Sequence, residues 1–199
     1  ATSIPDSLLE LLLREYKLGP QDCYRVAGPV NLVRLMSLAD LVDRPDLKFP
    51  AFTTRYPAAF SDQDHFDVIS QQDVLVHHPY ESFGAVTDFL RTAAEDPAVV
   101  AISMTIYRTG QISSLMESLI LAARSGKEVT VVVELMARFD EETNINWASR
   151  LEEVGAHVVF GVVGNKTHAK MCLVIRKEKS GLRRYVHIGT GNYHPRTAS

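Results

Sequence analysis

The sequence predicts an α/β fold: a mixed β-sheet flanked by helices, preceded by a small, mainly helical segment. From residue 74 onward, nearly uninterrupted apolar runs alternate with helical patterns, which is typical of a sheet covered on both faces. Two helical patterns precede residue 52. The 199 residues, 46% hydrophobic and 23% charged, suffice for one α/β domain with a smaller appendage and argue against disorder.

The N-terminal segment has signals for two helices and a connector. Ser7-Leu-Leu-Glu10 has the pattern of a capping box, and Gly19-Pro20 must end the helix that follows it. A second apolar helix is predicted over residues 29–41. Prolines among short polar stretches then indicate a connector: Pro45, Pro50 and Pro57. We therefore expect a segment of residues 1–52 and a domain of residues 53–199.

The larger domain is predicted to alternate strands and helices. Ser114-x-x-Glu117 should cap its second helix, and Gly126 should end it. The predicted helices cover residues 80–94, 114–124 and 142–154, and the predicted strands cover residues 99–107, 129–135, 157–161, 168–176 and 184–188. The sheet should be at least partly parallel, with its last two strands joined as an antiparallel hairpin at Ser180-Gly181.

Composition limits the setting of the chain. No apolar run is long enough to span a bilayer, and the first residues lack the pattern of a signal peptide. Cys23 and Cys172 form neither a disulfide framework nor a zinc spacing. We therefore expect a soluble protein of the reducing cytosol.

Charge is distributed unevenly along the chain. Lys and Arg are outnumbered 13 to 23 by Asp and Glu before residue 161, and outnumber them 8 to 1 from there on. Such a basic segment suits an anionic partner such as phosphate, polyphosphate or nucleic acid. The alternative is a solvated hairpin, formed by Arg176, Lys177, Lys179, Arg183 and Arg184.

Thr167-His168-Ala169-Lys170 is the sharpest chemical feature. Side chains two apart on a strand share a face, so His168 and Lys170 should point together. A neutral imidazole offers a nucleophilic nitrogen, and the lysine supplies positive charge for phosphoryl oxygens. Alone, the triplet is common, and a structural histidine at a strand edge is the alternative.

Further candidate phosphate contacts follow three predicted strands. Gly189-Thr190-Gly191-Asn192 allows close backbone approach, with Thr190 and Asn192 as donors; a simple glycine-rich turn is the alternative. Arg108 and Arg138 each follow a strand, at the carboxyl edge where open α/β sheets bind ligands. Arginine forks match phosphate oxygens. Alternatively, Arg138 pairs with Glu134 or with Asp140, a plausible N-cap.

Other polar and aromatic residues are expected to be structural. His77 and His78 are adjacent, so their side chains diverge, and no third ligand has helpful spacing. Trp147 is expected in the core, and His157 and His187 within apolar strands as buried or edge histidines.

Several motifs occur together in one order. They are Asp73-Val-Leu-Val-His-His-Pro-Tyr-Glu-Ser-Phe83, Thr105-Ile-Tyr-Arg-Thr109, Val133-Glu-Leu-Met-Ala-Arg-Phe-Asp-Glu-Glu142, Asn144-Ile-Asn-Trp147, Lys166-Thr-His-Ala-Lys170 and His187-Ile-Gly-Thr-Gly-Asn-Tyr193. Together they closely resemble the polyphosphate kinases that use a phosphohistidine, a branch of the phospholipase D-like fold. Departures are Ser103-Met104, usually Lys-Gln in the family, and Met136, often Lys or Gln.

The resemblance implies an ATP:polyphosphate phosphotransferase with ATP or ADP and polyphosphate as substrates and Mg²⁺ as cofactor. His168 would be phosphorylated and Lys170 would assist it. Arg108 and Arg138 match arginines linked with magnesium-bound phosphate; arginine has no lone pair for the metal, so they would clamp phosphate beside it. The protein would be a cytoplasmic homo-oligomer, with peripheral membrane association left open.

By the same resemblance, residues 1–52 would end a helical head domain, and residues 53–199 would belong to the first of two related C-terminal catalytic domains. The chain would be truncated at both ends and inactive in isolation. One alternative is a phospholipase D-like phosphodiesterase or nuclease, but these usually carry an aspartate where Ile175 stands. The other is a non-catalytic module that binds polyanions.

Overall fold

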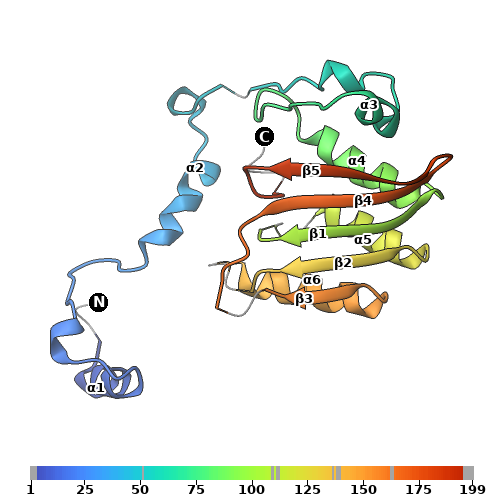
Figure 1. Ribbon diagram of the computed structural model, residues 1–199. Helices are drawn as coiled ribbons and strands as arrows, with labels where there is room; N and C mark the ends of the chain where they lie inside the picture. The colour runs from blue at the N-terminus through green and yellow to red at the C-terminus, as the bar shows by residue number, and fades with distance from the viewer. Residues whose placement is uncertain are drawn as a thin grey trace. The chain divides into compact units, whose positions relative to one another are not determined.

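The computed structural model describes residues 4–50, 52–108, 110, 113–135, 137, 140–161 and 164–194. The chain divides into two compact units, residues 1–51 and 52–199 (Figure 1). Within the described residues, no helix is long and apolar enough to cross a membrane.

The first unit consists of short helical pieces. They are α1 (Asp6–Glu15), the 3₁₀ turns η1 (Pro20–Asp22), η2 (Leu32–Ser37) and η3 (Pro45–Leu47), and α2 (Leu38–Leu41). The predicted capping box is wrong, because Pro5 is the N-cap of α1 and no side chain caps it. The second predicted helix forms only as η2 and α2. Its apolar side chains are exposed, and a helix without packing partners is marginal in water.

A five-stranded mixed sheet, ordered β3-β2-β1-β4-β5, forms the centre of the second unit. The strands are β1 (Val99–Ile106), β2 (Glu128–Val133), β3 (His157–Phe160), β4 (Lys170–Glu178) and β5 (Gly181–Gly189). The first three are parallel, and β4 is antiparallel to both β1 and β5. The predicted mixed sheet and C-terminal hairpin are confirmed.

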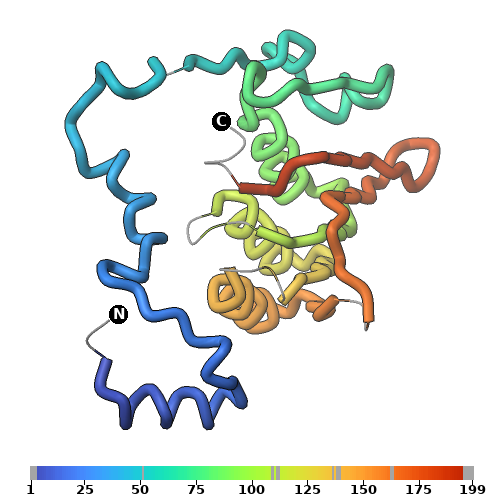
Figure 2. Tube along the Cα trace, turned by 90° about the vertical axis from the view of Figure 1, so that its left-hand side faces the viewer, coloured from blue at the N-terminus to red at the C-terminus, as the bar shows by residue number. Residues whose placement is uncertain are grey.

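Helices α4 (Gly84–Glu95), α5 (Ser114–Arg124) and α6 (Glu141–Glu153) lie on one face of this sheet (Figures 1 and 2). Short elements α3 (His65–Gln71) and η4 (Ala58–Phe60) precede them. Alternation along β1 shows which face is the core: Ile102 and Met104 are buried, whereas Ser103 between them is half-buried. Among the described residues of the second unit no helix covers the opposite face, which differs from the expectation of two covered faces.

Local capping differs from two expectations. The N-cap of α5 is Ser113 and not Ser114, because the Ser113 hydroxyl accepts the Met116 N–H at 3.4 Å. Asp140 does occupy the N-cap position of α6, but its side chain makes no cap hydrogen bond. Helix α4 begins at Gly84, since the residues after His77 form a turn closed by the Glu81 N–H on the His77 carbonyl at 2.8 Å.

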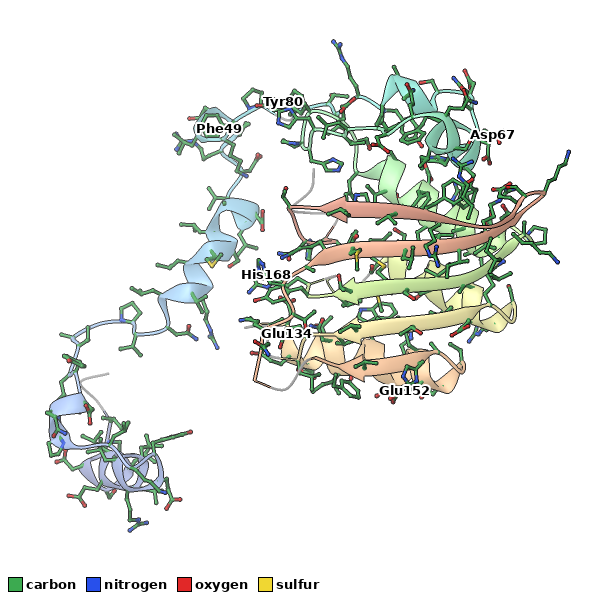
Figure 3. All side chains as sticks on the ribbon, viewed as in Figure 1. Phe49, Asp67, Tyr80, Glu134, Glu152 and His168 are labelled. Carbon is green, nitrogen blue, oxygen red and sulfur yellow. The ribbon has the colours of Figure 1, made fainter. Side chains whose placement is uncertain are left out.

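The ends of several strands lie at one edge of the sheet. Strands β1, β2, β3 and β5 end there, and β4 begins there (Figure 1). Figure 3 places His168 and Glu134 together at this edge. The topology therefore brings residues more than sixty positions apart in sequence into one region.

Candidate active site

His168 lies in the loop just before β4 and is exposed. The predicted strand over residues 168–176 begins two residues later than expected, at Lys170, so His168 is not part of the pleated ladder. The two residues are nevertheless linked, because the Lys170 ammonium donates to the His168 carbonyl at 2.6 Å. Both side chains also approach the Tyr107 ring, although His168 lies before the strand.

The ring of Tyr107 is the common neighbour of the site. The imidazole of His168 meets it edge to face, with ring centroids 4.9 Å apart and planes at 77°. Three cations lie 5.1–5.5 Å from the centre of the same ring: Lys170, Lys166 and Arg108. Cations favour the electron-rich face of an aromatic ring. Tyr107 therefore gathers the proposed nucleophile and the positive charge before any substrate is present.

Lys170 is buried at the start of β4, with 5% of its surface exposed. Burial lowers the pKa of Lys170 below its usual value, the Tyr107 hydroxyl raises it and Arg108 lowers it further. A desolvated ammonium interacts strongly with an incoming anion, because little water competes for it.

Arg108 lies two residues beyond the end of β1, and its guanidinium lies 3.1 Å from the Asp140 carboxylate. Asp140 therefore contacts an arginine of the site in place of capping α6. Arg138, the second predicted phosphate clamp, lies outside the described residues.

Side chains from β1 and from the residue after β2 contact the loop that carries His168. The Thr105 hydroxyl donates to the Ala169 carbonyl at 2.7 Å and accepts the Met171 N–H at 3.0 Å. On the other side, the Glu134 carboxylate accepts the Thr167 N–H at 2.7 Å. The residues flanking His168 are thus fixed by specific hydrogen bonds outside the ladder.

Helix α6 is hydrogen-bonded to the residues that follow β1 and β2. The fully buried amide of Asn144 donates to the carbonyls of Tyr107, at 3.0 Å, and Glu134, at 2.9 Å. Trp147 is buried as predicted, and its indole N–H donates to the Gly110 carbonyl at 2.9 Å. Tyr107, Glu134 and Asn144 were not identified as site residues from sequence. Their signals were position and motif: Tyr107 ends one predicted strand, Glu134 lies one residue before the end of another, and all three lie within the motifs of the resemblance.

The glycine-rich segment lies beside Lys170, since Gly189 pairs with Lys170 in the β4–β5 ladder. A Cβ on Gly189 would come within 3.3 Å of the His187 ring and 3.8 Å of the Lys170 Cβ. Thr190 is exposed and Asn192 half-buried. Among the described residues, the Asn192 Oδ1 is buried without a hydrogen-bond partner. Residues 189–193 also line a cavity of about 450 Å³, closed on its other side by residues 74–79.

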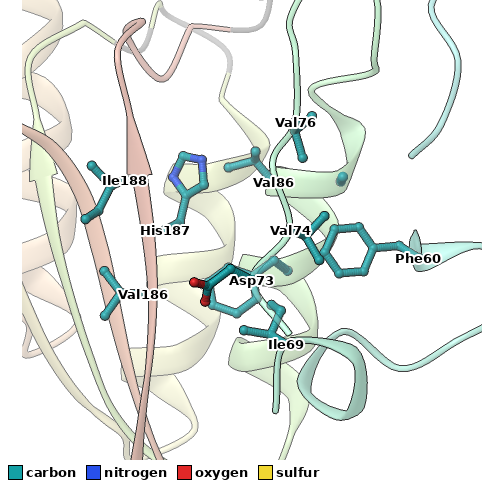
Figure 4. Close-up of a pocket in the computed structure, with 11 residues that line it drawn as sticks. Phe60, Ile69, Asp73, Val74, Val76, Val86, Val186, His187 and Ile188 are labelled. Atoms are coloured by element: carbon teal, nitrogen blue, oxygen red, sulfur yellow. The ribbon is translucent and has the colours of Figure 1, made fainter. Parts of the chain in front are cut away.

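A second cavity of about 370 Å³ lies between β5 and residues 73–76 (Figure 4). It is mainly apolar, and the His187 ring projects into it. The Nδ1 of His187 lies 2.9 Å from the Tyr193 hydroxyl, and burial lowers the pKa of His187 to about 4. His78 likewise has a backbone partner, with its Nδ1 2.8 Å from the Glu81 carbonyl. Both histidines therefore have structural partners, as expected from sequence.

The basic segment does not form one patch. Arg176 pairs with Arg183 in the hairpin, six residues along β4 from Lys170, which is about 20 Å at ~3.3 Å per residue. Arg176 is neutralised by Asp96 and Glu178, each at 2.7 Å. The hairpin tip and the His168 edge are thus separate basic regions.

The described residues hold no group of three or more His, Cys, Asp or Glu side chains placed to bind a metal ion. Lysine and arginine cannot coordinate Mg²⁺, because they have no free lone pair. The protein side chains described do not by themselves fit a magnesium site.

Comparisons with known proteins show the family of this chain. Residues 64–199 match the family model for the polyphosphate kinase C-terminal domain 1. Polyphosphate kinases of Burkholderia lata and Burkholderia multivorans are each 64% identical over 98% of this chain, and that of Paraburkholderia phytofirmans is 62% identical. The chain spans 29% of the length of these relatives.

A solved structure extends the match to the fold. The crystal structure of polyphosphate kinase from Porphyromonas gingivalis superposes with a TM-score of 0.67 at 31% identity, covering 97% of this chain and 31% of that one. The fold, the family profile and the relatives coincide over most of the chain. The chain therefore belongs to the polyphosphate kinase family.

Proposed function

We propose that this chain supplies the phosphohistidine site of a polyphosphate kinase, which moves the terminal phosphoryl group of ATP to polyphosphate reversibly through His168. The observation that carries the proposal is the meeting of one imidazole with three cations around Tyr107, at the edge where three strands end. The named activity of the relatives supports the same reaction.

The reaction has two balanced steps. A ring nitrogen of His168 attacks the γ-phosphorus in line, so that an N–P bond forms, the P–O bond to ADP breaks and ADP leaves. A terminal oxygen of polyphosphate then attacks the same phosphorus, and the N–P bond breaks. Lys170 and Arg108 offset the charge on the equatorial oxygens, and Thr190 and Asn192 are proposed to donate to phosphate.

In this arrangement the main contribution to catalysis is electrostatic stabilisation of the transition state. A cation about 4 Å from a phosphoryl charge contributes about 4 kcal/mol at an effective dielectric constant near 20. Because each ~1.4 kcal/mol is a factor of ten in rate, such contacts matter only if they are stronger in the transition state. Cations assembled beforehand around Tyr107 need little reorganisation when the substrate arrives.

Mg²⁺ is proposed to enter with the nucleotide phosphates, since the described side chains do not by themselves fit a magnesium site. Arg138 is proposed as a second phosphate clamp from its place in the sequence.

We also propose that residues 1–52 belong to a helical head domain and residues 53–199 to a first C-terminal catalytic domain. The full-length protein is proposed to be a cytoplasmic homo-oligomer.

The test uses the full-length protein with γ-³²P-labelled ATP and Mg²⁺. We expect an acid-labile, alkali-stable label on the wild type and none on His168→Ala. His157→Ala is the matched control, since His157 is an exposed histidine at the opposite end of its strand from the site edge. Retained labelling of His168→Ala would refute the assignment.

A further inference from the structure

We propose that Glu134 is a positioning residue for phosphoryl transfer, which sets the backbone of the loop carrying His168. The inference rests on the proposed function and adds a residue to it. Glu134 directly follows β2 and is 5% exposed. Its Oε2 accepts the N–H of Thr167, the residue immediately before His168, at 2.7 Å.

The loop needs such a contact because the sheet does not hold it. The β4–β5 pairing begins at Lys170, and the β1–β4 pairing reaches only to Cys172. Residues 166–169 therefore lie beyond both ladders. The described side-chain contacts to their backbone come from Thr105 at Ala169, Glu134 at Thr167 and Lys170 at His168.

Glu134 is itself fixed on two sides. Its N–H donates to the Ile106 carbonyl at 2.9 Å, which extends the β1–β2 pairing by one residue. Its carbonyl accepts the Asn144 amide, which also holds the Tyr107 carbonyl. One buried amide thus holds the backbone carbonyls of two residues whose side chains contact the His168 loop, Glu134 and Tyr107.

The choice of a carboxylate at this edge supports a positioning role. A buried carboxylate beside the loop that carries His168 repels anionic phosphate, so it does not serve as a phosphate contact. A carboxylate that accepts a backbone N–H makes a shorter and stronger bond than a neutral acceptor does. Misplacing a nucleophile by about 1 Å can cost about 100-fold in rate.

Three substitutions of Glu134 separate the effects of side-chain length, of charge and of folding. E134Q keeps the length and an acceptor oxygen but loses the charge. E134D keeps the charge but is one methylene shorter, and E134A loses both. Glu128→Ala is the matched control, because Glu128 is an exposed glutamate at the other end of the same strand.

The measurement is single-turnover phosphoenzyme formation by the full-length protein, with the KM for ATP and the unfolding midpoint of each variant. We expect the labelling rate of E134D and E134A to fall about 10- to 100-fold with the KM for ATP within about threefold of wild type. E134Q should recover most of the loss, and Glu128→Ala should match the wild type.

Other outcomes would overturn the inference. If E134D labels at the wild-type rate while E134Q does not, charge and not reach is what matters. If every loss scales with the unfolded fraction, the role is only structural. A wild type that forms no phosphoenzyme would overturn the proposed function as well, whereas normal labelling of wild type, E134D and E134A alike would overturn this inference alone.

Discussion

Tyr107 shows how a residue with no reactive group can organise a reactive site. Its ring contacts the His168 imidazole and the cations of Lys166, Lys170 and Arg108. Sequence could suggest His168, Lys170 and Arg108, because their chemistry is visible in the residue type. It could not suggest Tyr107 or Glu134, whose importance depends on which strand ends meet.

The ring and the hydroxyl of Tyr107 can be tested separately. Tyr107→Leu should slow phosphoenzyme formation about tenfold, because an edge-to-face ring pair contributes about 0.5–1.5 kcal/mol. Tyr107→Phe keeps the ring and should recover most of that rate. Single-turnover labelling of the full-length protein measures both, and equal losses in the two variants would show that the hydroxyl matters and not the ring.

At the scale of elements, the sequence predicted the five strands and three main helices but misplaced several ends. The strand expected from His168 begins at Lys170, and α5 is capped by Ser113. Apolar periodicity predicts that an element exists, because burial requires it. Its ends depend on hydrogen bonds to distant residues, such as Thr105 with Ala169, which periodicity does not contain.

Asn144 joins three elements, so its loss should affect both stability and activity. Asn144→Leu leaves the Tyr107 and Glu134 carbonyls without this donor, and each buried unpaired group costs about 1–3 kcal/mol. We expect faster amide hydrogen exchange in β1, β2 and α6 and slower labelling of His168. Asn146→Leu, an exposed position on the same helix, should change neither. Wild-type exchange in Asn144→Leu would contradict the role of this amide.

Strand β5 should be sensitive to acid through His187. Its pKa is lowered to about 4 in the folded protein, against about 6.5 in an unfolded chain, so the unfolded state binds the proton first as pH falls. The contribution of neutral His187 to the free energy of unfolding is fully present above pH ~6.5. It is lost progressively as the pH falls to ~4, and the total loss is about 3 kcal/mol.

This dependence can be followed by hydrogen exchange of the β5 amides in the full-length protein at pH 7 and pH 4.5, corrected for intrinsic exchange. The wild type should lose protection at pH 4.5, while His187→Leu should lose much less, since leucine does not titrate. An equal loss in both proteins would place the acid sensitivity elsewhere.

At the scale of the whole molecule, basic residues that follow one another in sequence form two separate regions in the structure. The basic segment after residue 160 is consistent with one polyanion surface, but the hairpin places Arg176 and Arg183 about 20 Å from Lys170. Fold class was predictable because patterns of burial repeat along the chain. The exposed sheet face was not predictable, because uninterrupted apolar runs are also typical of strands that are covered on both faces. Met171 and Ile188, on β4 and β5, are exposed there.

The two basic regions should differ in function. Lys166→Glu, beside Tyr107, should raise the KM for polyphosphate by about tenfold or more, because it reverses a charge at the site. The double substitution Lys177→Glu and Lys179→Glu at the hairpin tip should leave kcat and KM near wild type. A larger effect at the tip would favour a polyanion-binding surface separate from the catalytic edge, with binding that weakens steeply with salt.

The central claim is that His168 holds the phosphoryl group between donor and acceptor. The most direct measurement is a chase: full-length phosphoenzyme labelled from γ-³²P-ATP is freed of nucleotide, mapped by peptide analysis and mixed with unlabelled polyphosphate or ADP. The account predicts label on the peptide containing His168 and its transfer into longer polyphosphate or into ATP. Label on another residue, or release only as inorganic phosphate, would contradict it.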